Sequence, residues 1–274
     1  MNEGDFMCCE NNKTITIAFW NLKDHELSSY ICELIKENNI DIMILAEAEK
    51  INPQEIETNL NNYKLHFGYK DKHYVYFFVK SEIRIEQMQE GNRFLMMTCV
   101  KNNFKFNIMG LHLQSKTKNQ DFSREETIRD ILNHIGTYEN DEPKSVILGD
   151  FNLTPYEDPM VNFGLFHSIL FKDLMEREFT TCGGRTYQKF YNPTYTIVSE
   201  ENKTYGSYYT KDRETIHWLF LDQCLMRKSM IKFFKEIKVI KEIGDQPLMK
   251  NNKPNINISD HLPLLVKFEE EKNG

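Results

Sequence analysis

Short apolar runs, each followed by a polar side chain, recur along this chain and predict its elements. Residues 14–20 (TITIAFW) are rich in β-branched and aromatic residues, and residues 40–46 (IDIMILA) are almost continuously apolar. Both patterns are typical of β-strands, and the second indicates a strand buried on both faces. Further strands are predicted at residues 74–79, 94–100, 104–111, 145–148, 218–226 and 262–268.

Two other segments have apolar residues at helical spacing. One carries them on a single face between Leu27 and Ile35, with Asp24 as its expected N-cap. The other covers about residues 124–139. Residues 101–104 (KNNF) predict a tight hairpin, because asparagine tolerates a positive φ. The pattern thus predicts both strands and helices.

The composition is that of a folded protein rather than a disordered or fibrous one. The chain has 274 residues, of which 40% are hydrophobic and 27% charged, and it contains no internal repeat and no linker rich in Pro, Gly or Ser. We therefore expect one domain at residues 13–270, preceded by a flexible leader at residues 1–12. Residues 163–215 are rich in loop-forming and aromatic residues, and no elements are assigned there.

Location and redox state are predicted from the absence of targeting signals and from the cysteines. No run approaches the ~20 apolar residues that a membrane span needs, and the acidic leader lacks the apolar core of a secretory signal. The six cysteines form no CxxC pair, and Cys32 and Cys99 lie within apolar segments, as reduced core cysteines do. The sequence predicts a cytoplasmic protein with free thiols and no membrane partner.

The net charge limits the classes of function. With 34 Lys and Arg against 41 Asp and Glu, the formal charge is −7. This argues against a protein that coats nucleic acid without specificity, since such a protein needs a basic surface. The negative net charge is compatible with an enzyme that contacts a few phosphates and holds a metal among carboxylates.

Polar groups stand at the ends of the predicted buried strands. Neighbouring strands of a sheet lie ~4.8 Å apart, so groups at their ends can converge on one rim. Such a rim would hold three carboxylates, two carboxamides and two imidazoles, and this oxygen-rich set suits Mg²⁺ or Mn²⁺. The expected chemistry is metal-assisted attack of water on a phosphate ester. The seven residues are Asn21, Glu47, His112, Asp150, Asn152, Asp260 and His261.

Each of these residues taken alone also has an ordinary structural interpretation. Glu47 would be a surface carboxylate, Asp150 a turn residue that caps its own backbone, and His112 a hydrogen-bonded, half-buried imidazole. Glu49 competes with Glu47, and we prefer Glu47 because it directly follows the apolar run. The functional interpretation depends on all of these residues standing at strand ends in this order.

Six blocks of the sequence resemble motifs of the endonuclease/exonuclease/phosphatase superfamily, the fold of DNase I and exonuclease III. They span nearly the whole chain in order, and Gly-Asp-Phe-Asn and Ser-Asp-His are the most specific. The resemblance implies a four-layer α/β/β/α sandwich, with two mixed β-sheets packed face to face, helices outside and the site at one rim. The blocks are FWNL at 19–22, ILAEA at 44–48, GLHL at 110–113, LGDFN at 148–152, LDQ at 221–223 and SDHLP at 259–263.

The resemblance also implies which residues hold the metal. Glu47 corresponds to the principal Mg²⁺ ligand, with Asn21 beside it, and Mn²⁺ is expected to substitute for Mg²⁺. Asp260 fits a second metal position or a partner for an imidazole. The full implied set of metal ligands is Asn21, Glu47, Asp150, Asn152, Asp260 and His261.

The same resemblance implies catalytic roles for five residues. Asp150 would orient or deprotonate the attacking water, and Asn152 would bind the scissile phosphate or a metal. His261 would be the base or a phosphate-stabilising imidazole, oriented by Asp222. His112 would assist the leaving oxygen, since an imidazole of pKa ~6.5 can donate a proton at neutral pH.

The substrate stays open, because members of the superfamily cleave DNA, RNA, inositol phosphates and sphingomyelin. The chain lacks the Trp-Cys-Asp-Arg block of the inositol 5-phosphatases and the signals and disulfides of secreted members. Its aromatic blocks between residues 191 and 218 resemble a bacterial branch that supplies no substrate.

Two further features bear on the substrate. Four aromatic residues would form either a base-stacking platform or the packing of a long loop, and these are Tyr191, Tyr208, Tyr209 and Trp218. Residues 227–253 carry eight Lys and Arg against three Asp and Glu, and this stretch would either line the rim and hold a phosphate backbone or form a solvated face.

The first hypothesis is a Mg²⁺-dependent phosphodiesterase that hydrolyses nucleic acid, DNA in preference to RNA. The second is a phosphomonoesterase that uses the same metal site on a small phosphorylated metabolite or an inositol phosphate. A third, a binding module without activity, would be expected to have lost Glu47, Asp150 or His261, and all three are present.

Overall fold

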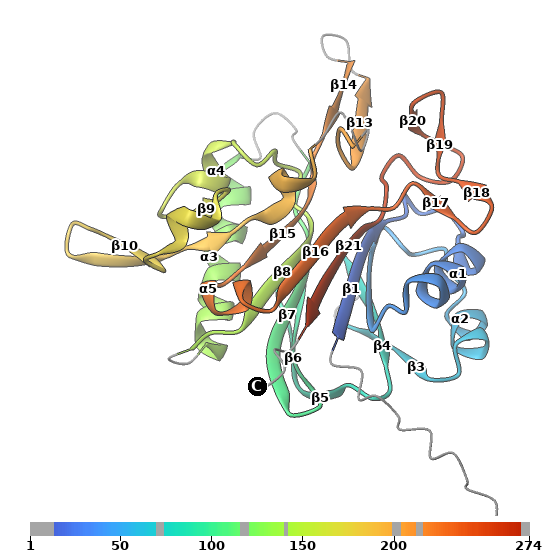
Figure 1. Ribbon diagram of the computed structural model, residues 1–274, viewed down its shortest axis with the longest axis horizontal. Helices are drawn as coiled ribbons and strands as arrows, with labels where there is room; N and C mark the ends of the chain where they lie inside the picture. Colours follow the sequence, from blue (N-terminus) through green and yellow to red (C-terminus); the bar gives the residue numbers. More distant parts are fainter. Residues whose placement is uncertain are drawn as a thin grey trace, which may run out of the picture.

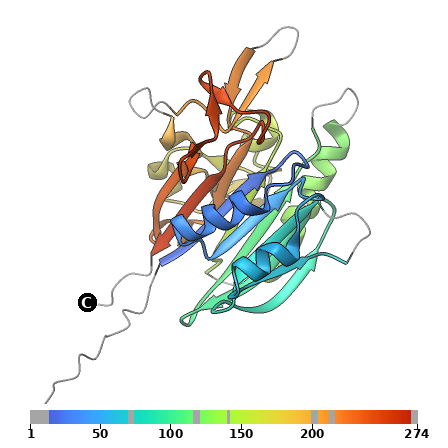
Figure 2. The ribbon, with the colours of Figure 1, turned by 90° about the vertical axis from the view of Figure 1, so that its right-hand side faces the viewer.

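Two large β-sheets face each other, and helices cover their outer surfaces (Figures 1 and 2). The computed structural model describes residues 14–69, 74–115, 121–139, 142–198, 204–211 and 216–269. The expected leader at residues 1–12 lies outside the described residues. The predicted four-layer α/β/β/α sandwich is confirmed.

The first sheet has six strands in the order β16-β21-β1-β2-β4-β3. β1 and β2 are parallel, and the other neighbours are antiparallel. β1 and β2 are buried along almost their whole length, as the continuous apolar runs predict. The strands are β1 (Thr14–Asn21), β2 (Ile42–Ala46), β3 (Tyr63–Phe67), β4 (Val75–Lys80), β16 (Phe234–Val239) and β21 (Leu264–Glu269).

The second sheet has seven strands in the order β5-β6-β7-β8-β15-β12-β9. β7 and β8 are parallel, and β15 runs antiparallel to β8. This arrangement brings the end of β7, the end of β8 and the start of β15 to one edge. The strands are β5 (Arg84–Glu90), β6 (Phe94–Lys101), β7 (Phe104–His112), β8 (Ser145–Asp150), β9 (Ser168–Ile169), β12 (Phe190–Tyr191) and β15 (Asp222–Met226).

Three longer helices form the outer layers. α1 (Ser28–Asn38) and α2 (Pro53–Asn59) lie beside the first sheet, and α3 (Asp121–Tyr138) lies beside the second (Figure 1). The remaining elements are short helices and two-stranded hairpins. They are α4 (Asp158–Val161), η1 (Lys172–Met175), β10 (Phe179–Cys182), β11 (Arg185–Gln188), η2 (Pro193–Ile197), β13 (Tyr208–Lys211), β14 (Ile216–Leu219), α5 (Lys228–Ile231), β17 (Glu242–Ile243), β18 (Gln246–Pro247), β19 (Met249–Lys250) and β20 (Lys253–Pro254).

Two apolar clusters hold these layers together. The larger includes buried residues of both sheets, such as Phe19, Phe77 and Ile108, together with the inner face of α1. The smaller packs Ile128 and Ile131 of α3 against the second sheet. In the described part of the chain no helix is long and apolar enough to cross a membrane.

The predicted hairpin at residues 101–104 is confirmed. Asn102 and Asn103 have φ of 48° and 66°, and Lys101 lies opposite Phe104 in the ladder between β6 and β7. Two asparagines with positive φ make the tight turn that matches the twist of the strands.

Two predictions about elements are wrong. The strand predicted at residues 218–226 is two strands, because β14 pairs with β13 in a separate hairpin and β15 joins the second sheet only at Asp222. Asp24 does not cap α1, which begins at Ser28; the backbone N–H of Ser28 donates instead to Glu26 Oε1 at 3.0 Å.

Candidate active site

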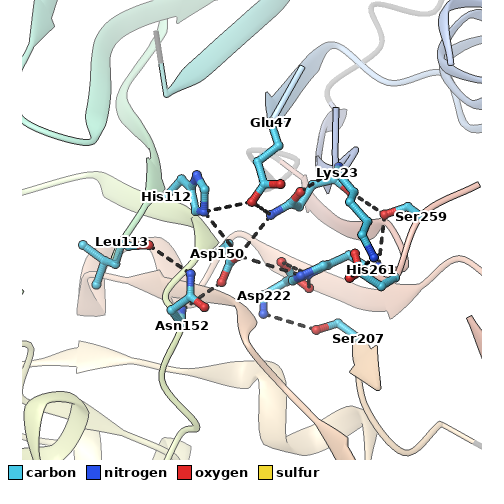
Figure 3. Close-up of polar contacts among 12 residues, drawn as sticks. Lys23, Glu47, His112, Leu113, Asp150, Asn152, Ser207, Asp222, Ser259 and His261 are labelled. Carbon is cyan, nitrogen blue, oxygen red and sulfur yellow. Dashed lines mark hydrogen bonds and ion pairs between the residues drawn. The ribbon is translucent and has the colours of Figure 1, made fainter. Parts of the chain in front are cut away.

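The predicted polar residues meet where the two sheets end side by side (Figure 3). In the second sheet, Asp150 at the end of β8 lies opposite both His112 at the end of β7 and Asp222 at the start of β15. In the first sheet, Asn21 ends β1 opposite Ala46, and Glu47 follows Ala46 directly. The register of the strands therefore brings the backbone positions of these residues close together.

The side-chain amide of Asn21 links the two carboxylates of the site. Its Nδ2 donates to Glu47 Oε1 at 3.2 Å and to Asp150 Oδ2 at 3.1 Å. Asn21 is buried, and its Oδ1 accepts a hydrogen bond from the backbone N–H of Lys23 at 3.0 Å. One amide thus bridges the first sheet to the second at the centre of the site.

Two imidazoles face Asp150 from different elements. His112 Nε2 lies 3.4 Å from Glu47 Oε1 and 3.8 Å from Asp150 Oδ2. His261 Nε2 lies 3.9 Å from the same Asp150 oxygen. Burial raises the pKa of Asp150 and Asp222 adds to this effect, while the two neighbouring imidazoles oppose it.

His261 is held by Asp222, as the resemblance implies. Its Nδ1 lies 2.8 Å and 3.1 Å from Oδ2 and Oδ1 of Asp222, which is fully buried. Burial alone would lower the pKa of His261, but the carboxylates of Asp222, Asp150 and Asp260 outweigh it and raise this pKa to about 9. The imidazole is therefore cationic at neutral pH in the metal-free protein.

Hydrogen bonds from the strand ends fix the His261 segment. Trp20 Nε1 donates to the carbonyl of His261 at 3.0 Å, and the hydroxyl of Ser259 accepts the His261 N–H at 3.1 Å. The same hydroxyl donates to the carbonyl of Asn21 at 2.7 Å. On the other side, Ser207 Oγ accepts from the Asp222 N–H at 3.2 Å. Sequence reasoning missed Ser207, because a lone serine in an aromatic segment gives no local signal.

Asn152 lies beside Asp150 in a tight turn. Its backbone N–H donates to Asp150 Oδ1 at 2.8 Å, and its Nδ2 donates to the carbonyl of Leu113 at 2.9 Å. Its φ is 49°, in the left-handed region. The turn orients the Asp150 carboxylate and keeps the Asn152 side chain on the wall of the cleft described below.

These groups open into a cleft of about 720 Å³. Four non-glycine residues of its wall have a positive φ, namely Lys23, Glu47, Arg93 and Asn152. Strained backbone of this kind tends to cluster at functional sites. The wall consists of Lys23, Glu47, Arg93, His112, Gln114, Ser115, Asp150, Asn152, Thr154, Glu157, Tyr208, Thr210, Leu219, Leu221, Asp260 and His261.

Six of the seven predicted strand-end residues line this cleft, and Asn21 is buried beneath it. Asp260 lies at one side, where its Oδ2 is 2.8 Å from Lys23 Nζ. Glu49, the competitor of Glu47, is exposed and is absent from the cleft wall. Lys23 and Arg93 are cleft residues that sequence reasoning did not identify, because no motif marks them.

The four aromatic candidates separate into different environments. Tyr208 lines the cleft, and its ring centroid lies 4.7 Å from that of His261. Tyr209 and Trp218 pack edge to face in the β13–β14 hairpin. Tyr191 is 4% exposed and belongs to the core between the sheets, so it packs the fold rather than lining the cleft.

The basic stretch at residues 227–253 is absent from the described cleft wall, so of its two predicted interpretations, lining the rim or forming a solvated face, the structure favours the second. Arg227 pairs with Glu139 at 2.7 Å, and Lys232 with Glu142 at 3.3 Å. Lys253 lies over the Tyr209 ring at 5.2 Å. These three basic side chains therefore have partners outside the cleft.

The donor set fits a hard divalent cation. Glu47 Oε1 and Asp150 Oδ2 share one bridging amide, and Asp150, Asp222 and His261 each offer a ligand atom within 4.8 Å of the others. Asp222 is already bonded to His261, and Asp260 is paired with Lys23, which leaves Glu47 and Asp150 as the cleft carboxylates that the Asn21 amide joins. Oxygen ligands in this number suit Mg²⁺ or Mn²⁺. Asn21 could bind the metal through its oxygen only if the side-chain amide were flipped, because its Nδ2 faces Glu47 and Asp150.

Comparison with solved structures identifies the fold. They include endonuclease/exonuclease/phosphatase proteins, and the chain has the fold of that superfamily. One is the endonuclease/exonuclease/phosphatase from Bacteroides vulgatus, with a TM-score of 0.62 and 14% identity over 94% of this chain and 99% of that one.

Two other similar structures are D. rerio TDP2, complexed with a single-strand DNA product, and an AP endonuclease from Archaeoglobus fulgidus. The first has a TM-score of 0.61 and 15% identity over 94% of this chain and 100% of that one. The second has a TM-score of 0.59 and 14% identity over 93% and 100% of the two chains. No protein-family model and no curated protein matches the sequence.

Proposed function

We propose that the protein is a metal-dependent phosphodiesterase that hydrolyses nucleic acid, DNA in preference to RNA. The observation that carries this proposal is the joint placement of Glu47, His112, Asp150 and His261 around the Asn21 amide in one cleft. Two similar structures, an AP endonuclease and TDP2 complexed with a single-strand DNA product, support a nucleic-acid substrate.

We assign metal binding and activation of the attacking water to particular residues of the cleft. Glu47 and Asp150 would hold Mg²⁺ or Mn²⁺, with Asn21, Asn152, Asp260 and His261 as the further predicted ligands. The bound ion supplies charge neutralisation for the phosphate and lowers the pKa of water. Asp150, whose Oδ1 is fixed by the Asn152 N–H, would orient the attacking water and take its proton.

The charge of His261 favours one of its two predicted catalytic roles. With a pKa of about 9 His261 would be an imidazolium at neutral pH, which favours stabilisation of the negative charge on the phosphate over the predicted roles of base and metal ligand. His112, which faces Glu47 and Asp150, would donate a proton to the leaving oxygen. Buried thiols at Cys32, Cys99 and Cys224 support the predicted reducing, cytoplasmic setting.

Two features favour a second candidate, a phosphomonoesterase for a small phosphorylated metabolite or an inositol phosphate. The cleft volume of about 720 Å³ lies within the range of small-molecule sites, ~300–1,000 Å³. The basic residues of 227–253 are absent from its wall. The same metal site would serve both reactions.

The test combines substrates with matched variants. Purified protein is assayed with Mg²⁺ or Mn²⁺ on duplex DNA, single-stranded DNA, RNA and a panel of phosphate monoesters. We expect cleavage of DNA that EDTA abolishes and that falls by about 10²-fold or more in Glu47→Gln and Asp150→Asn. Glu49→Gln removes an exposed carboxylate two residues from Glu47 and should retain full activity.

The outcomes separate the candidates. Intact DNA and RNA under all conditions, with phosphate released from a monoester, would reject the first proposal and support the second. Equal losses in Glu49→Gln and Glu47→Gln would remove the assignment of Glu47 as the metal ligand. Calorimetric titration with Mg²⁺ should give heat in the wild type and none in Glu47→Gln.

A further inference from the structure

Arg93 is a cleft residue that neither the motifs nor the proposed mechanism uses. It lies in the turn between β5 and β6, half-buried, with a φ of 68°. Its carbonyl accepts the backbone N–H of His112 at 3.0 Å, so the turn is attached to the end of β7. A bulky residue in the left-handed region costs free energy and persists where the surroundings impose it.

The Arg93 guanidinium lies over an aromatic ring that comes from the opposite sheet. Its Cζ lies 4.4 Å from the ring centroid of Tyr74, within the range of a cation–π contact. Tyr74 directly precedes β4, whose first residue, Val75, lies opposite Ala46, the residue before Glu47. The stacked pair therefore joins the His112 strand end to the Glu47 strand end on the wall of the cleft.

Stacking leaves the N–H donors of Arg93 available. Among the residues that the structure describes, its side chain forms no ion pair and donates no hydrogen bond. Lys23, the other Lys or Arg side chain of the cleft wall, differs because Asp260 lies 2.8 Å from its Nζ. A guanidinium is a planar fork of N–H donors that matches two phosphate oxygens, and the contact with Tyr74 restricts where this fork can lie.

We propose that Arg93, stacked on Tyr74, binds a second phosphate of the substrate, one that is not hydrolysed. This inference rests on the proposed phosphoesterase function and specifies its substrate as a molecule with two phosphates. In the proposed mechanism the scissile phosphate would lie beside Glu47, Asp150 and the two imidazoles, which are close together. A cation at the Glu47 and His112 side of the cleft is then suited to the neighbouring phosphate, in a nucleic-acid backbone or in a small bisphosphate.

Binding tests the inference independently of turnover. Affinities of thymidine 3′,5′-bisphosphate and thymidine 5′-monophosphate are measured by calorimetry with Ca²⁺ present. We expect the wild type to prefer the bisphosphate by about tenfold or more, since a charged hydrogen-bonded pair contributes on that scale. The preference should vanish in Arg93→Ala and persist in part in Arg93→Lys, because lysine keeps the charge without the planar fork.

Steady-state kinetics provide a second test of the inference. The ratio of kcat/KM is compared for thymidine 5′-(p-nitrophenyl phosphate) with and without a 3′-phosphate. This ratio should favour the 3′-phosphorylated compound in the wild type and in Arg129→Ala, whose arginine lies on α3 and pairs with Glu125. In Arg93→Ala the ratio should approach one.

Several results would overturn the inference. Equal affinity for the two nucleotides in the wild type would do so, as would a selectivity ratio unchanged in Arg93→Ala, which would mean that Arg93 acts on the scissile phosphate or on packing alone. Absence of turnover with both compounds would contradict the proposed function, while the binding measurement still decides this inference. Competition by a short single-stranded oligonucleotide or by an inositol bisphosphate distinguishes the two sources of the second phosphate.

Discussion

The charge of a single residue, His261, depends on the carboxylate that holds it. Asp222 is the main reason that the pKa of His261 rises against the effect of burial. The two side chains come from β15 and from the segment before β21, so their pairing is a tertiary contact. A neutral amide at position 222 would leave burial as the dominant influence on the imidazole.

Asp222→Asn should therefore lower the pKa of His261 from about 9 to near or below the ordinary value of 6.5. Imidazole NMR resonances, followed from pH 5 to 10 in the metal-free protein, measure this pKa directly. The control is Asp130→Asn, which alters a surface Asp–His pair on α3 and should leave the His261 titration unchanged. A pKa above 8 in Asp222→Asn would contradict the assignment.

The raised pKa of His261 also makes the stability of the fold depend on pH. The folded pKa of His261 exceeds the unfolded value of about 6.5, so the ion pair stabilises the fold fully below about pH 6.5. That stabilisation is lost as the pH rises through about 9. In Asp222→Asn the contribution is absent, so the free energy of unfolding of this variant should fall less steeply than that of the wild type between pH 7 and 10.

At the scale of elements, the register of β7 against β8 places His112 opposite Asp150. Gly149 permits this pairing, because a Cβ at this position would lie 2.1 Å from the carbonyl oxygen of Leu111. The Gly-Asp-Phe-Asn motif therefore contains a packing requirement beside the aspartate that we propose to be catalytic. Backbone atoms cannot withdraw as a flexible side chain would.

Gly149→Ala should destabilise the protein by about 2 kcal/mol or more, since overpacking against a rigid neighbour costs on this order. Urea unfolding measures the effect. Gly136→Ala is the matched control, because its Cβ meets nothing within 4 Å on α3, and alanine in a helix gains about 0.5–1 kcal/mol over glycine. Equal stability of the two variants would refute the role of the close approach.

At the scale of the whole molecule, a buried ion pair joins the two sheets at the end away from the cleft. Lys101 at the end of β6 places its Nζ 2.8 Å from Asp41 Oδ1, beside the start of β2, and 2.9 Å from the carbonyl of Thr14. The two side chains are 4% and 2% exposed. Burial raises the pKa of Asp41, while Lys101, the Thr16 N–H and Lys80 oppose this effect, so removal of Lys101 leaves the buried carboxylate with one backbone donor and a more distant cation at 3.8 Å.

Lys101→Met should therefore reduce the free energy of unfolding by about 3 kcal/mol. Lys105→Met removes a lysine of similar length from an exposed pair with Glu86 and should cost less than about 1 kcal/mol. Chemical denaturation compares the two. Because Lys101 lies at the far end of the sandwich, activity per folded molecule should be unchanged; a loss of activity at full folding would show that the two ends are coupled.

Much of the fold and site was predictable because its signals are local. Continuous apolar runs identified β1, β2 and β8, and the polar residue after each run identified Asn21, Glu47 and Asp150. The division of residues 218–226 into two strands was not predictable, since both halves are apolar and only pairing with β13 separates them. Helix α1 likewise begins later than the candidate cap Asp24 suggests, because Leu27 takes the cap position.

The sequence by itself determined which chemistry-bearing side chains stand at strand ends, since strand length and the residue that follows are encoded in consecutive positions. Only the tertiary structure decided how those ends meet: that the Asn21 amide spans Glu47 and Asp150, that Arg93 stacks on Tyr74, and that the basic residues of 227–253 lie elsewhere. The physical reason is that these contacts depend on how one sheet packs against the other, and a local sequence pattern does not encode this packing.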